Sequence, residues 1–366
     1  MYDFLFSPTQ LHFKTIKNRI VAAPPPTRLC ENDGNLSPQF FSYYSYMAEK
    51  EPGIIIIDGL AISNAAKGWL KQGIIADGNN FRAISELVNK LRKAECFPMI
   101  QLYHGGINAI PTTNHRLLGL SKITHNKIKG DIKELTSLEL DAVAYEYGLA
   151  ASLAWNAGFA GIEIEASEGS LIHQSLSPIT NKRSDQFSYK ANSGAHFLMR
   201  VIEAVKNSAP DLLISVKLSL RDLVPGGAGL SDCIAVAKKA KEAGASLFHL
   251  SQGLKIGDVT CLHPSFRGNT SPAPLSEDAL VFKKETGFTT ILGNGMHTPE
   301  IADNILARGI SDFVSLSRTL NREPNWINLA SRNQPIEFFK KCKRCMTCVA
   351  ASGHCPEEKT NQWRTK

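Results

Sequence analysis

The 366-residue chain lacks the features that mark membrane, secreted and repeat proteins. Its longest apolar runs, such as GIIIID from Gly53 and LLISVKLSL from Leu212, are far shorter than the about 20 residues that a membrane-spanning helix needs. The opening MYDFLFSPTQ has no basic region followed by a long apolar run, so we expect no secretory signal and a cytoplasmic protein. No internal repeat or low-complexity linker divides residues 1–334.

Modules that recognise nucleic acids or dinucleotides are missing as well. The chain has no aromatic-and-basic module of the RNA-binding kind, and its net charge of +7 is modest and partly local to KKCKRC and the closing RTK. A solvated basic tail is therefore favoured, although it could attract an acidic partner or a phosphorylated substrate. After the first apolar run the chain reads APPPTRLC, which is not the glycine-rich turn of a doubly wound dinucleotide fold.

Eight short apolar runs are present instead, and they are continuously apolar rather than strictly alternating. That pattern is typical of parallel strands covered on both faces. The runs are NRIVAA from Asn18, GIIIID from Gly53, FPMIQL from Phe97, GIEIE from Gly161, LLISVKL from Leu212, SLFHL from Ser246, TTILG from Thr289 and DFVSL from Asp312.

Amphipathic segments separate these runs. FRAISELVNKLRKA from Phe81 and SDCIAVAKKAKEAGA from Ser231 have helical spacing, and Thr136 with Glu139 forms a capping-box pattern. TPEIADNILARG places Pro299 at a first helical position. Eight strands alternating with helices predict an α/β fold, a (β/α)8 TIM barrel over residues 1–334 with a short Cys-rich extension over 335–366.

In such a barrel the active site lies at the carboxyl ends of the strands. The two last loops, GNGMHTP and SLSRTL, have the glycines and the arginine that bind phosphate. A phosphorylated cofactor or substrate is the favoured interpretation. The strand-end rule selects Pro24 to Arg28, Asp58, Gly59, Gln101 to His104, Glu165 to Ser170, Lys217, Lys255, Asn294, Gly295, Ser317 and Arg318.

Four of the eight cysteines are bunched near the C-terminus, and the gaps between them are two, two and six residues. Four thiolates at such spacing are typical of an iron–sulfur cluster, for which Cys342, Cys345, Cys348 and Cys355 are the candidate ligands. Zinc is an alternative, held by the four thiolates or by three of them with His354. Unligated thiols are the third interpretation.

Five separated motifs resemble the Old Yellow Enzyme family of FMN-dependent NADH:flavin oxidoreductases. They are LFSPTQL with IKNRIVAAPPPTRLCENDGNLS, IQLYHGG, GIEIEASEGSLIHQSLSPITNKRSDQF, VKLSLRDLVPGG and GNGMHTPEIADNILARGISDFVSLSRTL. SEG, LSLRDLV and the Cys-rich tail are most similar to the branch of 2,4-dienoyl-CoA reductases and trimethylamine dehydrogenase.

The resemblance implies a flavin site. Gln101 would bind the pyrimidine edge of FMN, and Lys217, where the family usually has Arg, would place a positive charge beside N1 and O2. The groups that would flank the ring or hold the phosphate are Pro24, Pro25, Pro26, Thr27, Gly59, Asn294, Gly295, Ser317 and Arg318.

The substrate side departs from the family. Glu165 and Glu168 stand where many members have His and His or Asn, and Glu168 alone fits the dienoyl-CoA reductase pattern. Ser170 stands in place of the usual proton-donating Tyr, and Lys255 in place of a His. A serine hydroxyl is a poor general acid. Lys255, and Tyr103 or His104 on the third-strand loop, are the remaining candidate proton donors, and cofactor packing is an equal alternative for the last two.

Three functions follow from the resemblance. The first is hydride transfer to an activated C=C bond of an enoyl, dienoyl or other α,β-unsaturated substrate. The second is flavin-dependent amine oxidation, because Glu165 and Glu168 would attract a cationic amine, unless one of them is protonated or paired with Lys255. The third is a flavin-binding electron-transfer subunit. Glu163, on the same strand face as Glu165, is expected to pair inside the barrel.

Related reductases have a four-iron cluster after the barrel, followed by an FAD and nucleotide-binding domain. The chain ends at Lys366, so we expect that domain to be absent. Electrons would then come directly from NAD(P)H, or through a 4Fe-4S cluster from a separate electron-transfer protein. The substrate and the oligomeric state are left open, and a homo-oligomer is compatible with the sequence.

Overall fold

The computed structural model describes most of the chain. The described residues are 2–23, 26–75, 80–111, 116–125, 128, 130–257, 259–261, 273–345, 347–348 and 355–357. Within these ranges no helix is both long and apolar enough to cross a membrane.

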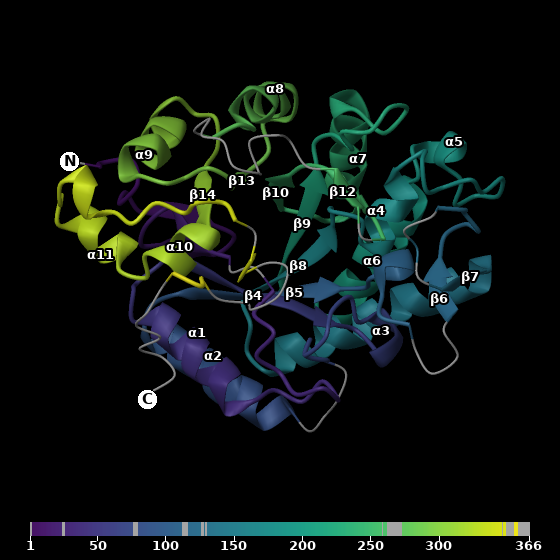
Figure 1. Cartoon of the computed structure of the whole chain (residues 1–366), viewed down its shortest axis with the longest axis horizontal. Coiled ribbons are helices and arrows are strands. Elements are labelled where there is room, and N and C mark those ends of the chain that lie inside the picture. Colours follow the sequence, from purple (N-terminus) through teal and green to yellow (C-terminus); the bar gives the residue numbers. More distant parts are fainter. Residues whose placement is uncertain are drawn as a thin grey trace.

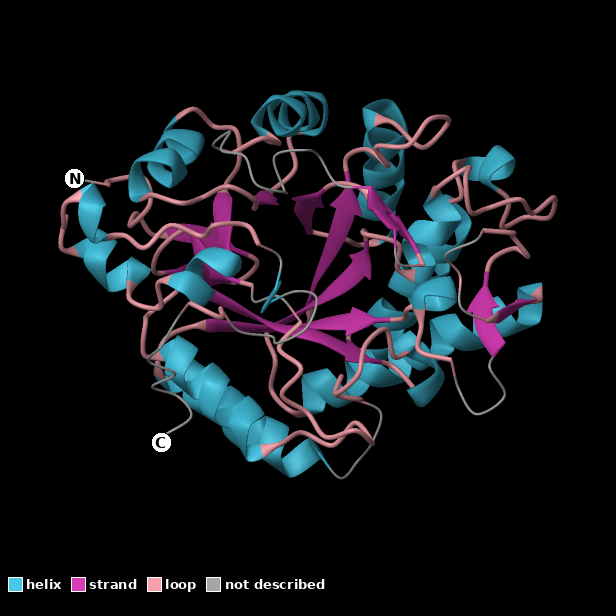
Figure 2. Cartoon of the chain, viewed as in Figure 1, coloured by secondary structure: helices cyan, strands magenta, loops and turns pink. Residues whose placement is uncertain are grey.

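Eight parallel strands close into a barrel, in the order β10-β13-β14-β3-β4-β5-β8-β9. Figure 2 shows these strands at the centre of the molecule with helices around them. All eight predicted strands are confirmed, and so is the (β/α)8 fold. The barrel strands are β3 Ile20–Ala22, β4 Ile54–Ala61, β5 Phe97–Tyr103, β8 Gly161–Ala166, β9 Leu213–Ser219, β10 Leu247–Ser251, β13 Thr290–Leu292 and β14 Phe313–Leu316.

The helices cover the outside of the barrel (Figure 1). The predicted capping box is present: Thr136 accepts a hydrogen bond from the Glu139 N–H, and the Glu139 carboxylate accepts one from the Thr136 N–H. The helices are α1 Pro38–Ala48, α2 Phe81–Lys93, α3 Ser137–Asn156, α4 Leu171–Leu176, α5 Tyr189–Asn192, α6 Ala195–Ser208, α7 Leu230–Ala243, α8 Ser276–Thr286, α9 Pro299–Ala307, α10 Arg318–Arg322 and α11 Trp326–Ser331.

Three two-stranded sheets outside the barrel were not predicted, because their strands are short and mix polar with apolar residues. They are β1 Thr9–Leu11 with β2 Lys14–Ile16, β6 Arg116–Gly119 with β7 Asp131–Glu134, and β11 Leu254–Ile256 with β12 Val259–Cys261. Leu11 and Ile16 of the first sheet belong to the same apolar cluster as Val21, Ile54 and Phe313 at the amino ends of the barrel strands.

Side chains alternate along each strand, which determines where polar groups can lie. On β8, Ile162 and Ile164 belong to the large core shared with the helices, whereas Glu163 and Glu165 point into the barrel. Inside the barrel the amino ends of the strands are filled by the apolar cluster of Val21, Ile54 and their neighbours. Polar inward residues therefore begin halfway along the strands and line the carboxyl end.

Candidate active site

A cavity of about 940 Å³ opens at the carboxyl ends of the barrel strands. Strand register builds its floor and wall from paired inward residues. Gln101 on β5 is paired with Glu163 on β8, and Glu165 on β8 is paired with Lys217 on β9. All eight strand ends predicted from sequence contribute residues to this one volume, which is within the 300–1,000 Å³ typical of ligand pockets.

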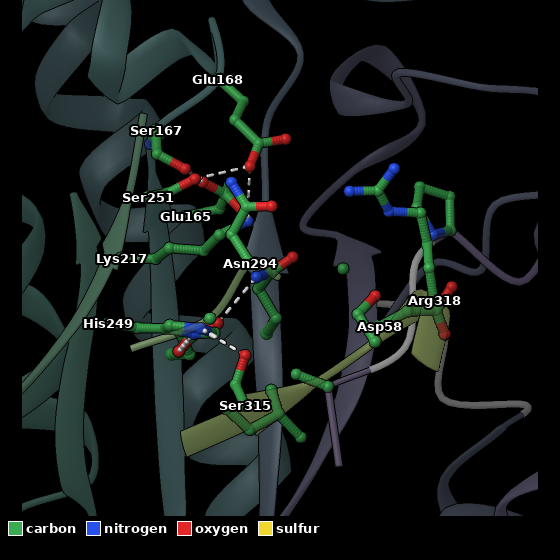
Figure 3. Close-up of a pocket in the computed structure, with 18 of the residues that line it drawn as sticks. Asp58, Glu165, Ser167, Glu168, Lys217, His249, Ser251, Asn294, Ser315 and Arg318 are labelled. Atoms are coloured by element: carbon green, nitrogen blue, oxygen red, sulfur yellow. Dashed lines mark hydrogen bonds and ion pairs between the residues drawn. The ribbon is translucent and has the colours of Figure 1, made fainter. Parts of the chain in front are cut away.

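Lys217 holds both glutamates of the β8 end. Its Nζ lies 2.9 Å from Glu165 Oε2 and 3.3 Å from Glu168 Oε1. Glu168 also accepts a hydrogen bond from Ser251 Oγ at 2.7 Å, and Glu165 accepts bonds from the N–H and hydroxyl of Ser167. Figure 3 shows this cluster on one side of the cavity, with Arg318 and Asp58 on the other. Both glutamates pair with Lys217, and the suggested pairing of one of them with Lys255 stays a prediction.

The three charged groups have distinct protonation preferences. Burial, together with the neighbouring Glu168, raises the pKa of Glu165 even though Lys217 opposes the shift. Burial would raise the pKa of Glu168 too, but Lys217 and Ser251 hold it below its ordinary value, and its side chain is 46% exposed to the cavity. The carboxylates raise the pKa of Lys217 against the effect of burial, so its ammonium stays charged.

Below this cluster a second polar network crosses the barrel. Glu163 is fully buried and accepts a hydrogen bond from Gln101 Nε2 at 2.8 Å, while its other oxygen lies 2.9 Å from His249 Nδ1. His249 Nε2 lies 3.1 Å from Ser315 Oγ. Against the effect of burial, His249 and Lys217 hold the pKa of Glu163 below its ordinary value. The expected pairing of Glu163 inside the barrel is confirmed, and its partners are His249 and Gln101.

The two candidate proton donors at the end of β5, Tyr103 and His104, lie in different environments. Tyr103 lines the cavity, and its ring packs on Trp69 with centroids 4.9 Å apart. Burial raises the pKa of Tyr103 well above its ordinary value. His104 is only 1% exposed, does not line the cavity, and accepts the Gly106 N–H at Nδ1. Burial lowers the pKa of His104 to about 3, which keeps the ring neutral.

Asp58 on β4 holds the loop after β3 in place. Its carboxylate accepts hydrogen bonds from the N–H and hydroxyl of Thr27 and from Tyr44 Oη at 2.6 Å. Thr27 is thereby buried behind the cavity wall, whereas Pro26 and Gly59 line the cavity. A Cβ added at Gly59 would lie 2.9 Å from Gln101 Oε1, so a larger residue here would displace the Gln101 amide. Pro24 and Pro25 lie outside the described residues.

Ser170 and Lys255 stand at the sequence positions where the family has proton-donating residues. The Ser170 hydroxyl donates to the Glu165 carbonyl at 2.7 Å and accepts the His173 N–H, so it caps α4 and does not line the cavity. Lys255 lies on β11 at the cavity rim, with its backbone carbonyl bound by Asn108 Nδ2. Of the two, only Lys255 can face a ligand in this cavity.

The loops after β13 and β14 form the predicted phosphate corner. Asn294, Gly295, Ser317 and Arg318 all line the cavity. Asn294 adopts a left-handed backbone, with φ of 69°, and both polar atoms of its amide are buried without a hydrogen-bond partner among the described residues. A buried amide of this kind costs free energy unless a ligand pairs with it. This corner therefore fits a polar group from a bound molecule.

The four C-terminal cysteines lie around a separate cavity of about 20 Å³, together with Arg318, Arg322 and Glu357. Cys342 and Cys345 also line the large cavity. Burial raises the pKa of Cys348 to about 11. Among the side chains that the structure describes, no three of His, Cys, Asp or Glu come together as a metal-binding group. The geometry therefore does not itself establish a cluster or a zinc site, and both stay predictions.

The residues present do fit a flavin mononucleotide. The large cavity is lined by an amide that can meet a pyrimidine edge, Gln101, by the cation of Lys217, by the unpartnered amide of Asn294 and by Arg318. Together these features define a barrel-type cofactor-binding protein in which an aromatic, phosphorylated ligand would lie across the strand ends.

Comparison with known proteins identifies the family. Residues 4–337 match the NADH:flavin oxidoreductase / NADH oxidase family, and the chain belongs to it. It is 31% identical over 344 residues to an NADPH dehydrogenase of Listeria welshimeri, covering 93% of this chain and 98% of the relative. The resemblance to the Old Yellow Enzyme family is confirmed, whereas assignment to the dienoyl-CoA reductase branch stays a prediction.

Two further matches are to longer proteins. An NADH oxidase of Thermoanaerobacter brockii is 28% identical over 348 residues, covering 94% of this chain and 52% of the relative. A 2-naphthoyl-CoA reductase, solved with 2-naphthoyl-CoA, shares the fold with a TM-score of 0.88 at 21% identity, covering 94% of this chain and 54% of that chain. The chain thus spans about half the length of these two relatives.

Sequence reasoning missed three groups that the structure places at the site: His249, Trp69 and Arg344. His249 could have been found, because it alternates with Phe248 and Leu250 on a predicted strand and so had to point inward. Trp69 and Arg344 lie on irregular segments, where no periodicity in the sequence indicates direction.

Proposed function

We propose that this chain is an FMN-dependent oxidoreductase that transfers a hydride from NAD(P)H to an activated C=C bond of an enoyl, dienoyl or other α,β-unsaturated substrate. The observation that carries the proposal is the cavity that joins Gln101, Lys217, the unpartnered Asn294 amide and Arg318. Family membership supports the choice of FMN and of a nicotinamide as the electron donor.

Bound FMN would supply the two-electron chemistry, accepting a hydride from a nicotinamide and delivering one to the substrate. The chain itself supplies charge and orientation. Lys217 keeps a permanent positive charge in the cavity because Glu165 and Glu168 hold its ammonium. Glu163 accepts a hydrogen bond from the side-chain N–H of Gln101, which holds the Gln101 amide in one orientation. The amide oxygen of Gln101 can then accept a hydrogen bond from a ligand.

The proton for the substrate must come from another group. Lys255 is the side chain we propose, since it lies at the cavity rim and is only half-buried. Tyr103 is the alternative within the cavity, where its raised pKa keeps the hydroxyl protonated at neutral pH.

Steady-state assays test this assignment. We expect the flavin-loaded protein to oxidise NADPH or NADH with 2-cyclohexenone or crotonyl-CoA as acceptor. Lys255→Met should lower turnover about 100-fold, the effect expected for loss of a general acid. Lys238→Met, an exposed lysine on α7, is the matched control and should stay within twofold. Failure of every enone and enoyl thioester to reoxidise the reduced flavin would overturn the proposal.

Amine oxidation is a second candidate, favoured by one observation. Glu168 is ionised and 46% exposed to the cavity, so it can attract a cationic amine. Under anaerobic conditions a tertiary amine such as trimethylamine should then bleach the flavin, and Glu168→Gln or Glu165→Gln should weaken this response. Absence of bleaching by amines, with reoxidation by enones, would leave the first candidate alone.

For the C-terminal segment we propose a 4Fe-4S cluster on Cys342, Cys345, Cys348 and Cys355, with a separate electron-transfer protein as its redox partner. Two facts support it: the close cysteine spacing, and the single small cavity that the four side chains line. Metal and acid-labile sulfide analysis of anaerobically purified protein tests it. Four iron and four sulfide per chain is the expected result, and zinc without sulfide would contradict it.

A further inference from the structure

We propose that Arg344 of the C-terminal segment, together with His297, completes the binding site for the phosphate monoester of the flavin. This inference rests on the proposed function, because it assumes that FMN occupies the large cavity. It assigns a ligand-binding role to a residue that lies between two of the cysteines and outside the barrel strands.

Arg344 has an unusual backbone conformation. Its φ is 55°, in the left-handed region that non-glycine residues rarely adopt, and its N–H lies 3.4 Å from Cys342 Sγ. The side chain is only 5% exposed. A buried arginine needs hydrogen-bonding partners for its charged guanidinium.

The guanidinium of Arg344 donates hydrogen bonds to the imidazole of His297. Arg344 Nη2 lies 2.7 Å from His297 Nε2, and Arg344 Nε lies 3.2 Å from the same nitrogen. A guanidinium can only donate, so His297 Nε2 accepts and the ring proton must lie on Nδ1. Arg344 therefore determines which tautomer of His297 is present.

The remaining nitrogen of His297 is a donor without an acceptor. His297 Nδ1 is buried and has no hydrogen-bond partner among the described residues. Burial, with the nearby cations Arg344, Arg318 and Lys341, lowers the pKa of His297 to about 4, in agreement with the neutral ring that its contact with Arg344 requires. His297 lines the large cavity two residues after Gly295, in the loop that carries the unpartnered Asn294 amide.

Charge in this corner points to a dianion. Arg318 and Arg344 both line the same cavity. Two guanidiniums brought together are stabilised by an anion between them, and a phosphate monoester supplies nearly two negative charges and three acceptor oxygens. The donors of Arg318, Asn294 and His297 match those acceptors.

The same chemistry could bind a phosphate of a nucleotide substrate, such as NADPH or an acyl-CoA. We assign it to the flavin because His297 lies in the loop that carries Asn294 and Gly295, and because Arg318 lies across the cavity from Lys217 and Glu168 (Figure 3). The experiment separates the two sources.

Flavin binding to the full-length apoprotein tests the inference, measured as quenching of flavin fluorescence. Arg344→Gln should weaken FMN binding about 10- to 100-fold, the range for loss of a charge-assisted hydrogen bond, and change riboflavin binding less than twofold. Arg344→Lys should recover part of the loss. Arg332→Gln, at an exposed arginine after α11, is the matched control and should bind both flavins normally.

Each other outcome has a definite meaning. Unchanged FMN affinity in Arg344→Gln would overturn the inference, as would equal losses for FMN and riboflavin, which indicate general disturbance of the cavity. Unchanged FMN affinity with a raised half-saturation concentration for NADPH would show that the site binds a phosphate of the nucleotide and not that of the flavin. If neither flavin binds the unaltered protein, the proposed function and this inference both fail.

Discussion

Glu165, Glu168 and Lys217 show how single residues determine the electrostatics of this site. Glu165, Glu168 and Lys217 lie within hydrogen-bonding distance and together carry at most one net negative charge. The cavity is therefore less acidic than the two glutamates in the sequence suggest. The serines at 167 and 251 each bind one carboxylate and separate the two glutamates in function. Glu165 is the buried member whose proton can shift, and Glu168 is the exposed member that stays ionised.

Removing the charge of Glu168 should therefore change the titration of Glu165. In Glu168→Gln we expect the pKa of Glu165 to fall, because the neighbouring negative charge that helps raise it is gone. Carbon NMR of protein labelled at the glutamate carboxyl carbon measures this midpoint, with Glu165→Gln identifying the signal. The exposed Glu285→Gln should leave the midpoint unchanged. An unmoved midpoint in Glu168→Gln would show that the two carboxylates are independent.

At the scale of elements, a buried pair fixes the loop that carries Glu168. His173 on α4 accepts the Gly169 N–H at Nδ1, at 2.8 Å, so its Nε2 donates to Asp222 Oδ1 at 3.0 Å. Asp222, after β9, also accepts from Ser177 Oγ and from the Ala228 N–H. The β8–α4 loop is thus held to the loop between β9 and α7.

Asp222→Asn should destabilise the fold in a pH-dependent way. Against the effect of burial, His173, Ser177 and the Ala228 N–H hold the pKa of Asp222 below its ordinary value of 3.8. A depressed folded-state pKa contributes stability above the unfolded pKa, and this is lost as pH falls through the folded pKa. We expect a loss of about 3 kcal/mol at pH 7, measured by urea unfolding.

The difference from the unaltered protein should narrow as the pH falls below about 3.8. Asp211→Asn, at an exposed aspartate before β9, is the matched control and should change the unfolding free energy by less than about 0.5 kcal/mol. If Asp222→Asn lowered the free energy of unfolding by the same amount at every pH, the shape of the Asp222 side chain, and not its charge, would stabilise the contact between the two loops.

At the scale of the whole molecule, the cavity joins segments from across the chain. Pro26, Gln101, Lys217, Asn294 and Arg344 all line it, and they span most of the sequence. Figure 1 shows the C-terminal part of the chain, coloured yellow, close to the middle of the barrel. A ligand that contacts all these segments binds only the folded state and so stabilises the complete barrel.

Thermal unfolding should report this coupling. FMN at about 100 times its dissociation constant stabilises the folded state by about 2.7 kcal/mol and should raise Tm by roughly 3–8 °C. Arg318→Gln should lose most of the shift produced by FMN while keeping that produced by riboflavin. Arg332→Gln should keep both. Identical shifts for the two flavins in the unaltered protein would show that the phosphate contributes nothing.

How much of this was predictable differs among the elements. The eight strands were all found, because each is a short, mainly apolar run that is buried in the barrel. Helix α3 was found from its capping box, which is a local signal. The short strands β6, β7, β11 and β12 carry no such signal, since they mix polar and apolar residues over four positions or fewer.

The features of the candidate site also differ in whether local sequence signals could predict them. The sequence by itself determined the barrel, the identity of the residues at its strand ends and the family, because these depend on periodicity, local caps and ordered motifs. Only the tertiary structure decided that Lys217 pairs with both glutamates, that the Ser170 hydroxyl is occupied as a helix cap, and that Arg344 binds His297. Those contacts depend on strand register and on the path of an irregular tail, which bring together residues far apart in the chain.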